Sequence, residues 1–286
     1  EEDVRGALPE RAPFAHKGDC GHILVVAGSA GKTGAACMTA SSALRVGAGL
    51  VTLGIPASLN TLASAGALEA MTLPLPETEE ATLDLSALGP ITEASERVQV
   101  LVLGPGLTTH PSTVALVHRL VQESPLPMVI DADGLNALAQ KMEILSGRGA
   151  PTLLTPHPGE MARLMGLSTR EVQRERVGVT QGLARERSVY VALKGARTVI
   201  AEPGGRAWIN PTGNSGMASA GMGDVLTGAV AGLLAQGMEP LEALLSGVYL
   251  HGLAGDLASE TLGRRGYLAS DVIAALPQAL SHLGAR

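Results

Sequence analysis

Aromatic residues are scarce in this chain: one Phe, three Tyr and one Trp stand among its 286 residues. Proteins that stack bases or sugars depend on aromatic rings, so this composition disfavours such binding modules. Runs of Lys and Arg are missing as well, and a formal net charge of −6 offers little to a phosphate backbone. Both absences argue against nucleic acid as the main partner.

Cysteine is equally rare. Cys20 and Cys37 are too few for a disulfide framework and show no Cys-x-x-Cys spacing, which favours a reducing compartment. The acidic N-terminus lacks the apolar segment of a secretion signal, so we expect a cytoplasmic location. The chain begins at Glu1 rather than Met, which is compatible with a processed chain or with a piece of a longer protein.

Long uninterrupted apolar runs are missing too. Residues 46–68 carry no charge, but Gly47, Gly49, Gly54 and Pro56 interrupt them. The pattern predicts a strand, a loop and a buried helix instead of a membrane span.

Short aliphatic runs, in contrast, recur along the whole chain and alternate with helical stretches. Apolar residues make up 45% of the sequence and the mean hydropathy is +0.23, which suffices for a large core. Continuous apolar runs are typical of parallel strands that are buried on both faces. The expected strands are residues 22–27, 50–55, 98–103, 128–130, 152–154 and 189–193, with an edge hairpin formed by residues 198–201 and 206–209.

Helices are expected on both faces of this sheet and throughout the last third of the chain. No internal repeat or Ser/Gly linker divides the sequence. Residues 1–286 are therefore predicted to form a single α/β domain around a central, mostly parallel sheet. The expected helices are residues 34–46, 111–123, 134–140, 158–165, 169–186, 224–236, 240–260 and 270–282.

Loops of Gly, Pro and polar residues follow four of these strands, at residues 28–31, 104–106, 131–134 and 155–160. Parallel sheets bind ligands in the crevice beyond the carboxyl ends of their strands. The coincidence predicts a small-molecule site. The first loop is not a P-loop, because Val26 stands where that motif requires its first Gly, but it remains a candidate for substrate contact.

Residues 213–224 are the most informative segment, because they contain no bulky side chain other than Met before a predicted helix. The first amides of a helix lack intrahelical acceptors and its dipole favours anions, so phosphate is a natural occupant. Gly221 and Gly223 allow a close backbone approach. Asp224 is then either a base for a substrate hydroxyl or simply the N-cap. The small-residue loop favours the anion site.

The sequence His157-Pro158-Gly159-Glu160 follows a strand and opens a helix. His157 is a candidate for substrate contact. Glu160 either contacts Mg²⁺ through water or only complements the helix dipole. Asp131 and Asp133 likewise face the metal or cap the helix at Gly134.

Lys194 ends a strand, where its ammonium either reaches a nucleotide phosphate or lies in solvent.

His16, Cys20 and His22 are residue types that bind zinc, and they lie close together in the sequence, with Cys37 not far off. Their spacing matches no standard zinc site, and a surface His with buried Cys residues fits better.

Taken together, these motifs resemble the NAD(P)H-hydrate dehydratases, which are repair enzymes with a ribokinase-like fold. The resemblance runs from about His16 to the C-terminal region, and the HPGE and GMA…GD elements are specific when they occur in this order. The resemblance rests on His16-Lys17-Gly18, residues 47–51 (GAGLV), 104–107 (GPGL), 131–136 (DADGLN), 155–160 (TPHPGE), Lys194-Gly195, and residues 216–218 and 223–226 (GMA and GDVL).

The resemblance implies a three-layer sandwich that dehydrates (S)-NADHX and (S)-NADPHX, the hydrated forms of NADH and NADPH. An adenine nucleotide phosphorylates the ring hydroxyl, with Mg²⁺ assisting, and phosphate then leaves. Phosphate is a better leaving group than hydroxide, and amides at a helix N-terminus suit a phosphoryl group. ADP is favoured over ATP, because the sequence looks bacterial and bacterial members mostly use ADP.

Residue roles also follow from the resemblance, position by position. Asp224 would be the catalytic base, and the amides of Gly221, Met222 and Gly223 would form the anion hole. Substrate contacts would come from Ala35, Gly106, His157 and Asp224, and nucleotide contacts from Lys194, Gly195, Ala196, Arg197, Thr198 and Gly223.

Two positions depart from the family pattern. Ala220 stands where Gly is usual and would be strained at positive φ, and Met222 stands where Ser is common. Because Asp224 is retained, activity remains the expectation. The family also implies a homo-oligomer, with a homotetramer favoured, and an NAD(P)H-hydrate epimerase that in many bacterial members is fused N-terminally.

Two alternatives remain at this stage. One is a ribokinase-like kinase of a hydroxymethylpyrimidine or hydroxyethylthiazole, which would release a stable phosphate ester. The other is a non-catalytic nucleotide-binding module. The HPGE and GMA elements favour the dehydratase over the kinase, and the retained Asp224 argues against a module that only binds.

Overall fold

The computed structural model describes residues 2–284, so Glu1, Ala285 and Arg286 of the predicted domain lie outside it. Within this range one nine-stranded sheet has the order β3-β2-β1-β4-β5-β6-β7-β8-β9. The strands from β1 to β7 are parallel, and β8 and β9 add an antiparallel hairpin at one edge. The strands are β1 (His22–Val26), β2 (Leu50–Pro56), β3 (Met71–Leu75), β4 (Val100–Leu103), β5 (Met128–Ile130), β6 (Thr152–Leu154), β7 (Tyr190–Leu193), β8 (Val199–Ala201) and β9 (Ala207–Ile209).

Alternate residues of the central strands enter two separate hydrophobic cores. Ile23 and Val25 of β1 belong to one core, and Leu24 and Val26 belong to the other. Because neither face meets water, the strand sequence is continuously apolar. The predicted α/β fold with helices on both faces is confirmed.

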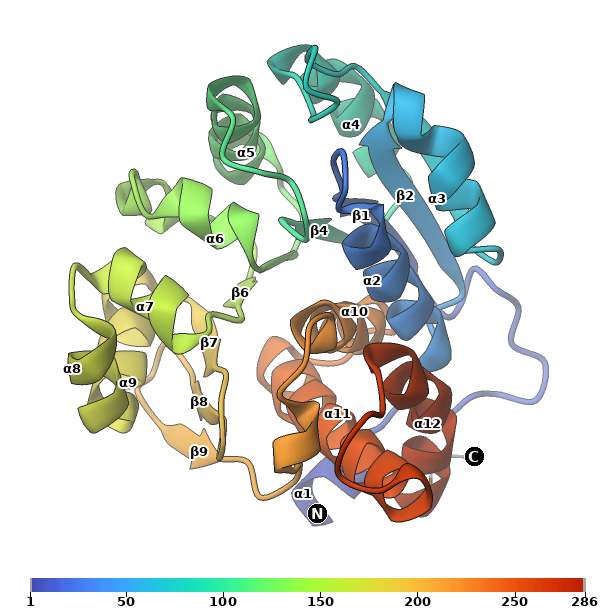
Figure 1. The fold of residues 1–286 in the computed structure, drawn as a ribbon, viewed down its shortest axis with the longest axis vertical. Helices are drawn as coiled ribbons and strands as arrows, with labels where there is room; N and C mark the ends of the chain where they lie inside the picture. Colours follow the sequence, from blue (N-terminus) through green and yellow to red (C-terminus); the bar gives the residue numbers. More distant parts are fainter. Residues whose placement is uncertain (1, 285–286) are drawn as a thin grey trace.

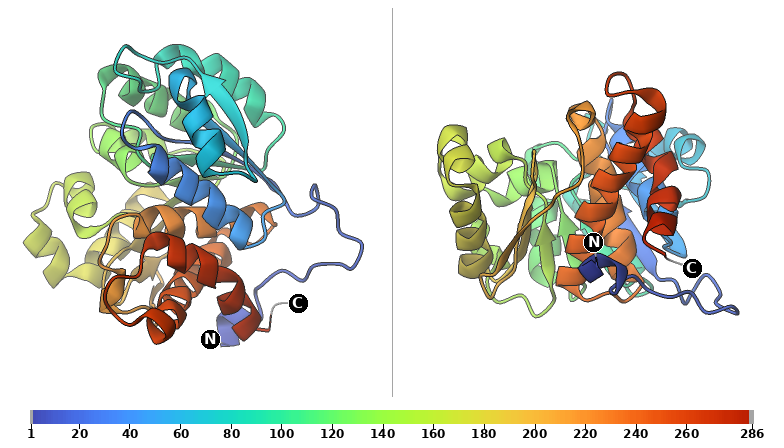
Figure 2. Two further views of the ribbon diagram at one scale, coloured as in Figure 1. Left: turned by 45° about the vertical axis from the view of Figure 1, so that its right-hand side comes forward. Right: turned by 90° about the horizontal axis from the view of Figure 1, so that it is seen from below.

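The helices form the two outer layers. The first core packs beneath α2, α10, α11 and α12, and the second beneath α4, α5, α6, α7 and α9 (Figures 1 and 2). The helices are α1 (Glu2–Arg5), α2 (Thr33–Arg45), α3 (Asn60–Gly66), α4 (Leu88–Ser95), α5 (Pro111–Glu123), α6 (Asp133–Leu138), α7 (Pro158–Met165), α8 (Thr169–Arg174), α9 (Arg176–Arg187), α10 (Met222–Ala235), α11 (Pro240–Leu262) and α12 (Ala269–His282), with short 3₁₀ helices η1 (Ala57–Leu59), η2 (Leu85–Ala87), η3 (Met142–Leu145) and η4 (Ser215–Met217).

The strand order reverses between β1 and β4, and this point determines where a crevice opens. The loops that follow these two strands are joined by two hydrogen bonds. Gly28 N donates to Pro105 O at 2.8 Å, and Ser29 Oγ donates to Gly106 O at 2.7 Å. Two of the predicted ligand loops therefore lie side by side.

Three local predictions were wrong. Strand β3 was missed, because Pro74 breaks its strand signal; β3 pairs only with β2, and an edge strand tolerates Pro. The helix predicted over residues 169–186 breaks at Glu175, whose backbone has φ −122° and ψ 39°. Within residues 46–68, α3 is not a buried helix, since Ala63 is its only buried residue.

Among the described residues, no helix is both long and apolar enough to span a bilayer. The longest, α11, is interrupted by charged and small residues such as Glu242 and Asp256.

Helix α10 lies unusually close to α2, and glycine makes this possible. A Cβ atom on Gly228 would lie 2.1 Å from Thr39 O, whereas a Cβ on Gly182 of α9 would meet nothing within 4 Å. Ser42 Oγ also donates a 2.6 Å hydrogen bond to Val225 O across this contact. The position of the α10 N-terminus thus depends on a backbone-to-backbone fit.

We predict that Gly228→Ala lowers the free energy of unfolding by about 1–3 kcal/mol, because the added methyl separates α2 from α10. The matched change Gly182→Ala should raise it by about 0.5–1 kcal/mol through helix propensity alone. Urea unfolding of both variants measures the difference. Equal effects of the same sign would contradict the proposed packing constraint.

Candidate functional site

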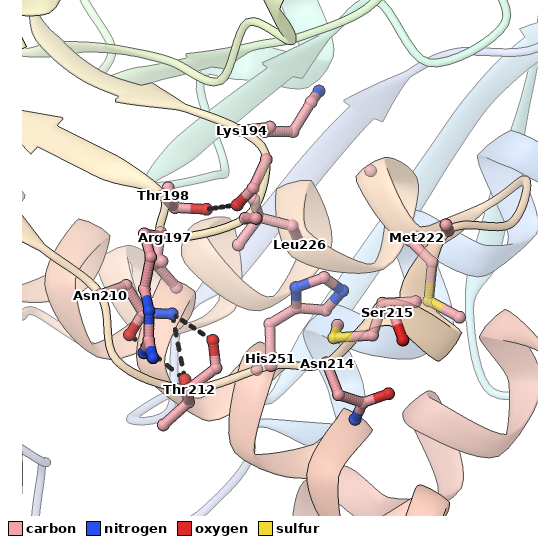
Figure 3. Close-up of a pocket in the computed structure, with 18 residues that line it drawn as sticks. Lys194, Arg197, Thr198, Asn210, Thr212, Asn214, Ser215, Met222, Leu226 and His251 are labelled. Carbon is pink, nitrogen blue, oxygen red and sulfur yellow. Dashed lines mark hydrogen bonds between the residues drawn. The ribbon is translucent and has the colours of Figure 1, made fainter. Parts of the chain in front are cut away.

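A cavity of about 490 Å³ opens between the β7–β8 turn, the segment after β9, and helices α10 and α11 (Figure 3). The nucleotide-contact residues predicted from the sequence all line it: Lys194, Gly195, Ala196, Arg197, Thr198 and Gly223. The structure thus brings this predicted group together at one site.

The β7–β8 turn forms one wall of the cavity, and two of its residues have a left-handed backbone conformation. Gly195 has φ 135° and Arg197 has φ 58°, so the chain reverses within a few residues. Arg197 Nη1 donates to Pro211 O at 2.5 Å, and Asn210 N donates to Thr198 O at 2.9 Å. The turn is therefore tied to the opposite wall.

The segment after β9 forms that opposite wall and is fixed to α11. Thr212 Oγ1 donates to Tyr249 O at 2.9 Å, and Gly213 N donates to Asp256 Oδ2 at 2.8 Å. Asn214 Nδ2 donates to Asp256 Oδ1 at 2.9 Å. These bonds fix the backbone of a loop that otherwise consists of small residues.

The N-terminus of α10 closes one end of the cavity. Gly221, at φ 88°, is the N-cap, and the first intrahelical hydrogen bond runs from Val225 N to Gly221 O. The amides of Gly221, Met222, Gly223 and Asp224 precede that bond, so they are the donors that a helix leaves open for an anion. The N-cap interpretation of Asp224 is wrong, because Asp224 lies within the first turn.

The concern about Ala220 is also resolved. Positive φ occurs at Gly221 and not at Ala220, so the methyl of Ala220 causes no backbone strain.

A buried ion pair lies against this helix end. Lys194 Nζ is 2.5 Å from Asp131 Oδ1 and 3.8 Å from Glu160 Oε2, and Thr227 Oγ1 donates to Asp131 Oδ2 at 2.7 Å. The solvated-lysine alternative is therefore wrong. Burial lowers the pKa of Lys194, but Asp131 and Glu160 outweigh it and raise the pKa overall. Lys194 is a permanent cation here.

The charges of the Lys194–Asp131 ion pair also act on the Asp224 carboxylate. Burial, and next the charge of Asp131, raises its pKa to about 6, while Lys194 acts in the opposite direction. A Cβ on neighbouring Gly223 would lie 3.3 Å from Lys194 Nζ. The cation, the open amides and the Asp224 carboxylate thus meet within one helical turn.

His157 and Glu160 form a capping box at the start of α7. His157 Nδ1 accepts from the amides of Gly159 and Glu160, and Glu160 Oε2 accepts from His157 N at 2.7 Å. Burial raises the pKa of Glu160 to about 7. The His157 side chain remains half-exposed.

The remaining predicted substrate residues lie at the β1–β4 crevice. A Cβ on Gly106 would be 3.4 Å from Ala35 Cβ, so these two residues adjoin. Thr39 Oγ1 donates to both Ala35 O and Asp224 O, at 3.0 and 3.2 Å, which links the crevice to α10. The Asp224 main chain therefore lies against α2, and the adjacent Gly223 lines the cavity.

The Asp133 carboxylate accepts hydrogen bonds from other loops and does not cap a helix. Its Oδ2 accepts from Thr108 N at 2.9 Å and from Lys32 Nζ at 3.1 Å, and the N-cap of α6 is Ala132. The prediction that Asp131 or Asp133 caps a helix at Gly134 is wrong.

Throughout residues 2–284, no group of three or more His, Cys, Asp or Glu side chains is placed to hold a metal ion. Cys20 and Cys37 are both free and half-buried.

Comparison with known proteins shows which family has this sequence and fold. Residues 23–278 match the family model described as NAD(P)H-hydrate dehydratase. The chain belongs to the NAD(P)H-hydrate dehydratase family.

Curated relatives agree with this assignment. A bifunctional NAD(P)H-hydrate repair enzyme of Moorella thermoacetica is 48% identical over 279 residues, which are 98% of this chain and 53% of that protein. The ADP-dependent (S)-NAD(P)H-hydrate dehydratase of Bacillus subtilis is 34% identical over 97% of this chain and 95% of its own length. The chain thus spans about half the length of the first relative.

The fold is shared with a solved member of the family. The ADP/ATP-dependent NAD(P)H-hydrate dehydratase of Bacillus subtilis, co-crystallized with ATP/Mg²⁺, superposes with a TM-score of 0.85 at 32% identity, covering 99% of this chain and 96% of that one. The ribokinase-like fold implied by the motifs is confirmed.

Several residues of this dehydratase-family site escaped sequence reasoning. Asn210, Thr212 and His251 line the cavity but belong to no predicted motif. The one signal was His251, a single imidazole on the apolar face of a long helix. Sequence reasoning also missed the pairing of Asp131 with Lys194, since 63 positions separate them.

We predict that Asp224→Asn stabilises the protein at pH 8 by about 1–2 kcal/mol. The folded-state pKa of Asp224, about 6, lies above its ordinary value of 3.8, so its favourable contribution is complete below pH 3.8 and is lost as the pH rises through 6. The Asn variant avoids that loss. Its advantage should therefore grow between pH 4 and pH 7 in urea unfolding.

The exposed Glu260 serves as the control for this experiment. Glu260→Gln should change stability by less than about 0.5 kcal/mol at every pH. An Asp224→Asn effect that stays constant with pH would show that burial does not penalise the Asp224 carboxylate.

Proposed function

We propose that this chain is a hydro-lyase that dehydrates (S)-NADHX and (S)-NADPHX to NADH and NADPH with ADP as the favoured phosphoryl donor. The observation that carries the proposal is the position of Asp224: its main-chain oxygen accepts from Thr39 of α2, its neighbour Gly223 lines the cavity, and the charge of Lys194 acts on its carboxylate. Family membership and the Bacillus subtilis relatives support the choice of substrate.

The two ligands occupy the two halves of the site. The nucleotide lies in the cavity, with contacts from the turn residues Lys194 to Thr198 and from Gly223. Its phosphates point to the α10 N-terminus, where the amides of Gly221, Met222 and Gly223 form the anion hole. The hydrated nicotinamide lies over Ala35, Gly106 and His157, so that its ring hydroxyl reaches Asp224.

The electrostatics of this arrangement require an anion. The Lys194 ammonium and the positive end of the α10 dipole lie together, and Asp131 already balances the first of them. A terminal phosphate of the nucleotide neutralises the positive end of the α10 dipole. The fixed donors then stabilise the charge that develops during phosphoryl transfer.

The chemistry follows from the charge state of Asp224. With a pKa of about 6 it is mainly a carboxylate at pH 7, ready to take the proton of the ring hydroxyl. The hydroxyl oxygen attacks the terminal phosphorus of ADP, and AMP leaves. The ring nitrogen then donates electrons, the C–O bond breaks and inorganic phosphate departs, and the neighbouring ring carbon loses a proton to water as the double bond is restored.

Mg²⁺ would arrive with the nucleotide and be held by phosphate oxygens and water, with Glu160 reaching it through a water molecule. When bound, the ion offsets phosphate charge during transfer. The Glu160 carboxylate is already engaged by His157 N and lies 3.8 Å from Lys194, which suits an indirect contact better than a direct one.

The wider setting is also part of the proposal. Residues 1–286 act as one dehydratase domain in the cytoplasm, as a homo-oligomer and in the tetrameric form that the family favours. An NAD(P)H-hydrate epimerase, fused or separate, would supply the S epimer, and the bifunctional relatives support such a partnership.

The direct test is recovery of absorbance at 340 nm when the purified protein is mixed with NADHX, Mg²⁺ and either ADP or ATP. We expect recovery, faster with ADP. Asp224→Asn should bind ADP nearly as well as the wild type but lose turnover by about 10²–10⁴-fold, because the proton has no acceptor.

Glu260→Gln is the activity control and should behave as the wild type does. If neither nucleotide restores absorbance although ADP binds, the protein is a related kinase or a binding module. Normal turnover by Asp224→Asn would remove Asp224 as the base while leaving the dehydratase assignment intact.

A further inference from the structure

The guanidinium of Arg176 holds the backbone of the β7–β8 turn from a position outside the cavity that this turn lines. Arg176 Nη2 donates to Leu193 O at 3.0 Å, and both terminal nitrogens donate to Lys194 O at 3.4 Å. Nη2 also donates to Arg197 O at 3.5 Å. One side chain that the proposed mechanism does not use therefore engages three carbonyl groups at the end of β7 and in the turn.

The position of Arg176 follows from the break at Glu175. Because the predicted helix is interrupted there, Arg176 becomes the first residue of α9, which lies alongside β7 and β8 (Figure 1). The dipole of a helix disfavours a cation at its N-terminus, so α9 by itself gives no reason for an arginine at this position. The carbonyl oxygens of the turn supply the compensating partners.

These bonds determine which way the peptide groups of the turn face. In a trans peptide the carbonyl and the following N–H point in opposite directions. The carbonyls of Lys194 and Arg197 face Arg176, so the N–H groups of Gly195 and Thr198 point away from it. Thr198 Oγ1 occupies a further carbonyl by donating to Gly195 O at 3.2 Å.

The amides of the turn, in contrast, are open. Across residues 2–284, no backbone oxygen accepts a hydrogen bond from the N–H groups of residues 195–198. These four residues line the cavity, and Arg176 lies behind them: a Cβ on Gly195 would be 3.1 Å from Arg176 Nη1. A turn with engaged carbonyls and open amides presents hydrogen-bond donors.

We propose that Arg176 is a positioning residue for nucleotide binding, which holds the turn carbonyls away from the cavity and so keeps the turn amides directed at acceptor groups of the nucleotide. The inference rests on the proposed function, in which an adenine nucleotide occupies this cavity. Arg176 does not contact the nucleotide. Without the guanidinium the carbonyls lose their partners, and those that turn toward the cavity repel the acceptor groups of the ligand.

Arg148 provides a matched control, because its guanidinium also donates to three carbonyl oxygens. The partners are Val121 O, Ser124 O at 3.1 Å and Leu126 O at 2.8 Å. They belong to the end of α5 and the connection to β5, and none of them lines the cavity. Both arginines are half-buried. The two side chains thus fix backbone in the same way at different places.

The test is calorimetric titration of the wild type, Arg176→Met and Arg148→Met with ADP, together with urea unfolding of each protein. Both variants should unfold at lower urea concentrations than the wild type, because each loses a set of carbonyl contacts. Only Arg176→Met should bind ADP more weakly, by about 10- to 100-fold. Arg148→Met should retain the affinity of the wild type.

Steady-state kinetics separates positioning from loss of stability. In Arg176→Met the KM for ADP should rise by a factor similar to the loss of affinity, while kcat changes by less than about 3-fold, since Asp224 is untouched. A variant that only loses folded protein would show a lower apparent kcat at an unchanged KM. Such a result for Arg176→Met would overturn the inference.

Two binding results would overturn it as well: wild-type ADP affinity in folded Arg176→Met, and equal weakening of ADP binding in Arg148→Met. If circular dichroism shows that Arg176→Met does not fold, Arg176→Lys replaces it. Its ammonium lacks the planar fork that reaches all three carbonyls, so wild-type ADP affinity in Arg176→Lys would contradict the inference.

Failure of the proposed function gives a different pattern. If the wild type binds no ADP, the proposed function fails and the inference fails with it. If the wild type binds ADP but forms no NADH, the dehydratase function fails, and the affinities of Arg176→Met and Arg148→Met still decide the role of Arg176.

Discussion

The buried ion pair of Lys194 and Asp131 is the interaction on which the rest of the site depends. It joins the carboxyl ends of two strands that are far apart in sequence, and Thr227 ties it to α10. A lysine buried this deeply is tolerated only when a carboxylate is in contact with it. The pair therefore fixes the distance between the β5 loop, the β7 end and the first turns of α10.

This constraint divides the site into regions of different polarity. At one end lie the cation and the open amides of α10, which are donors that suit an anion, while burial raises the pKa of Asp224 to about 6, a proton affinity suited to a base at neutral pH. The glycines of α10 let this helix approach α2, whose Thr39 hydroxyl donates to the main-chain oxygen of Asp224. Packing and catalysis thus depend on the same few residues.

Much of this architecture could be predicted from the sequence. Continuous aliphatic runs indicated the parallel strands, and the small-residue segment 213–224 indicated a loop that lines the cavity and leads into α10, because both signals are local. Strand β3 could not be found, since Pro74 is acceptable only at an edge, and edge position is a property of the whole sheet. The burial of Lys194 and the orientation of His251 depend on contacts between distant segments, so no local pattern revealed them.

The central claim is that phosphorylation of the ring hydroxyl leads to elimination and not to a stable ester. Phosphorus-31 NMR of the protein with (S)-NADHX, ADP and Mg²⁺ measures this directly. The account predicts one AMP and one inorganic phosphate for each NADH formed, with no lasting phosphate ester. Accumulation of a phosphorylated ring, or NADH formation without loss of ADP, would contradict it.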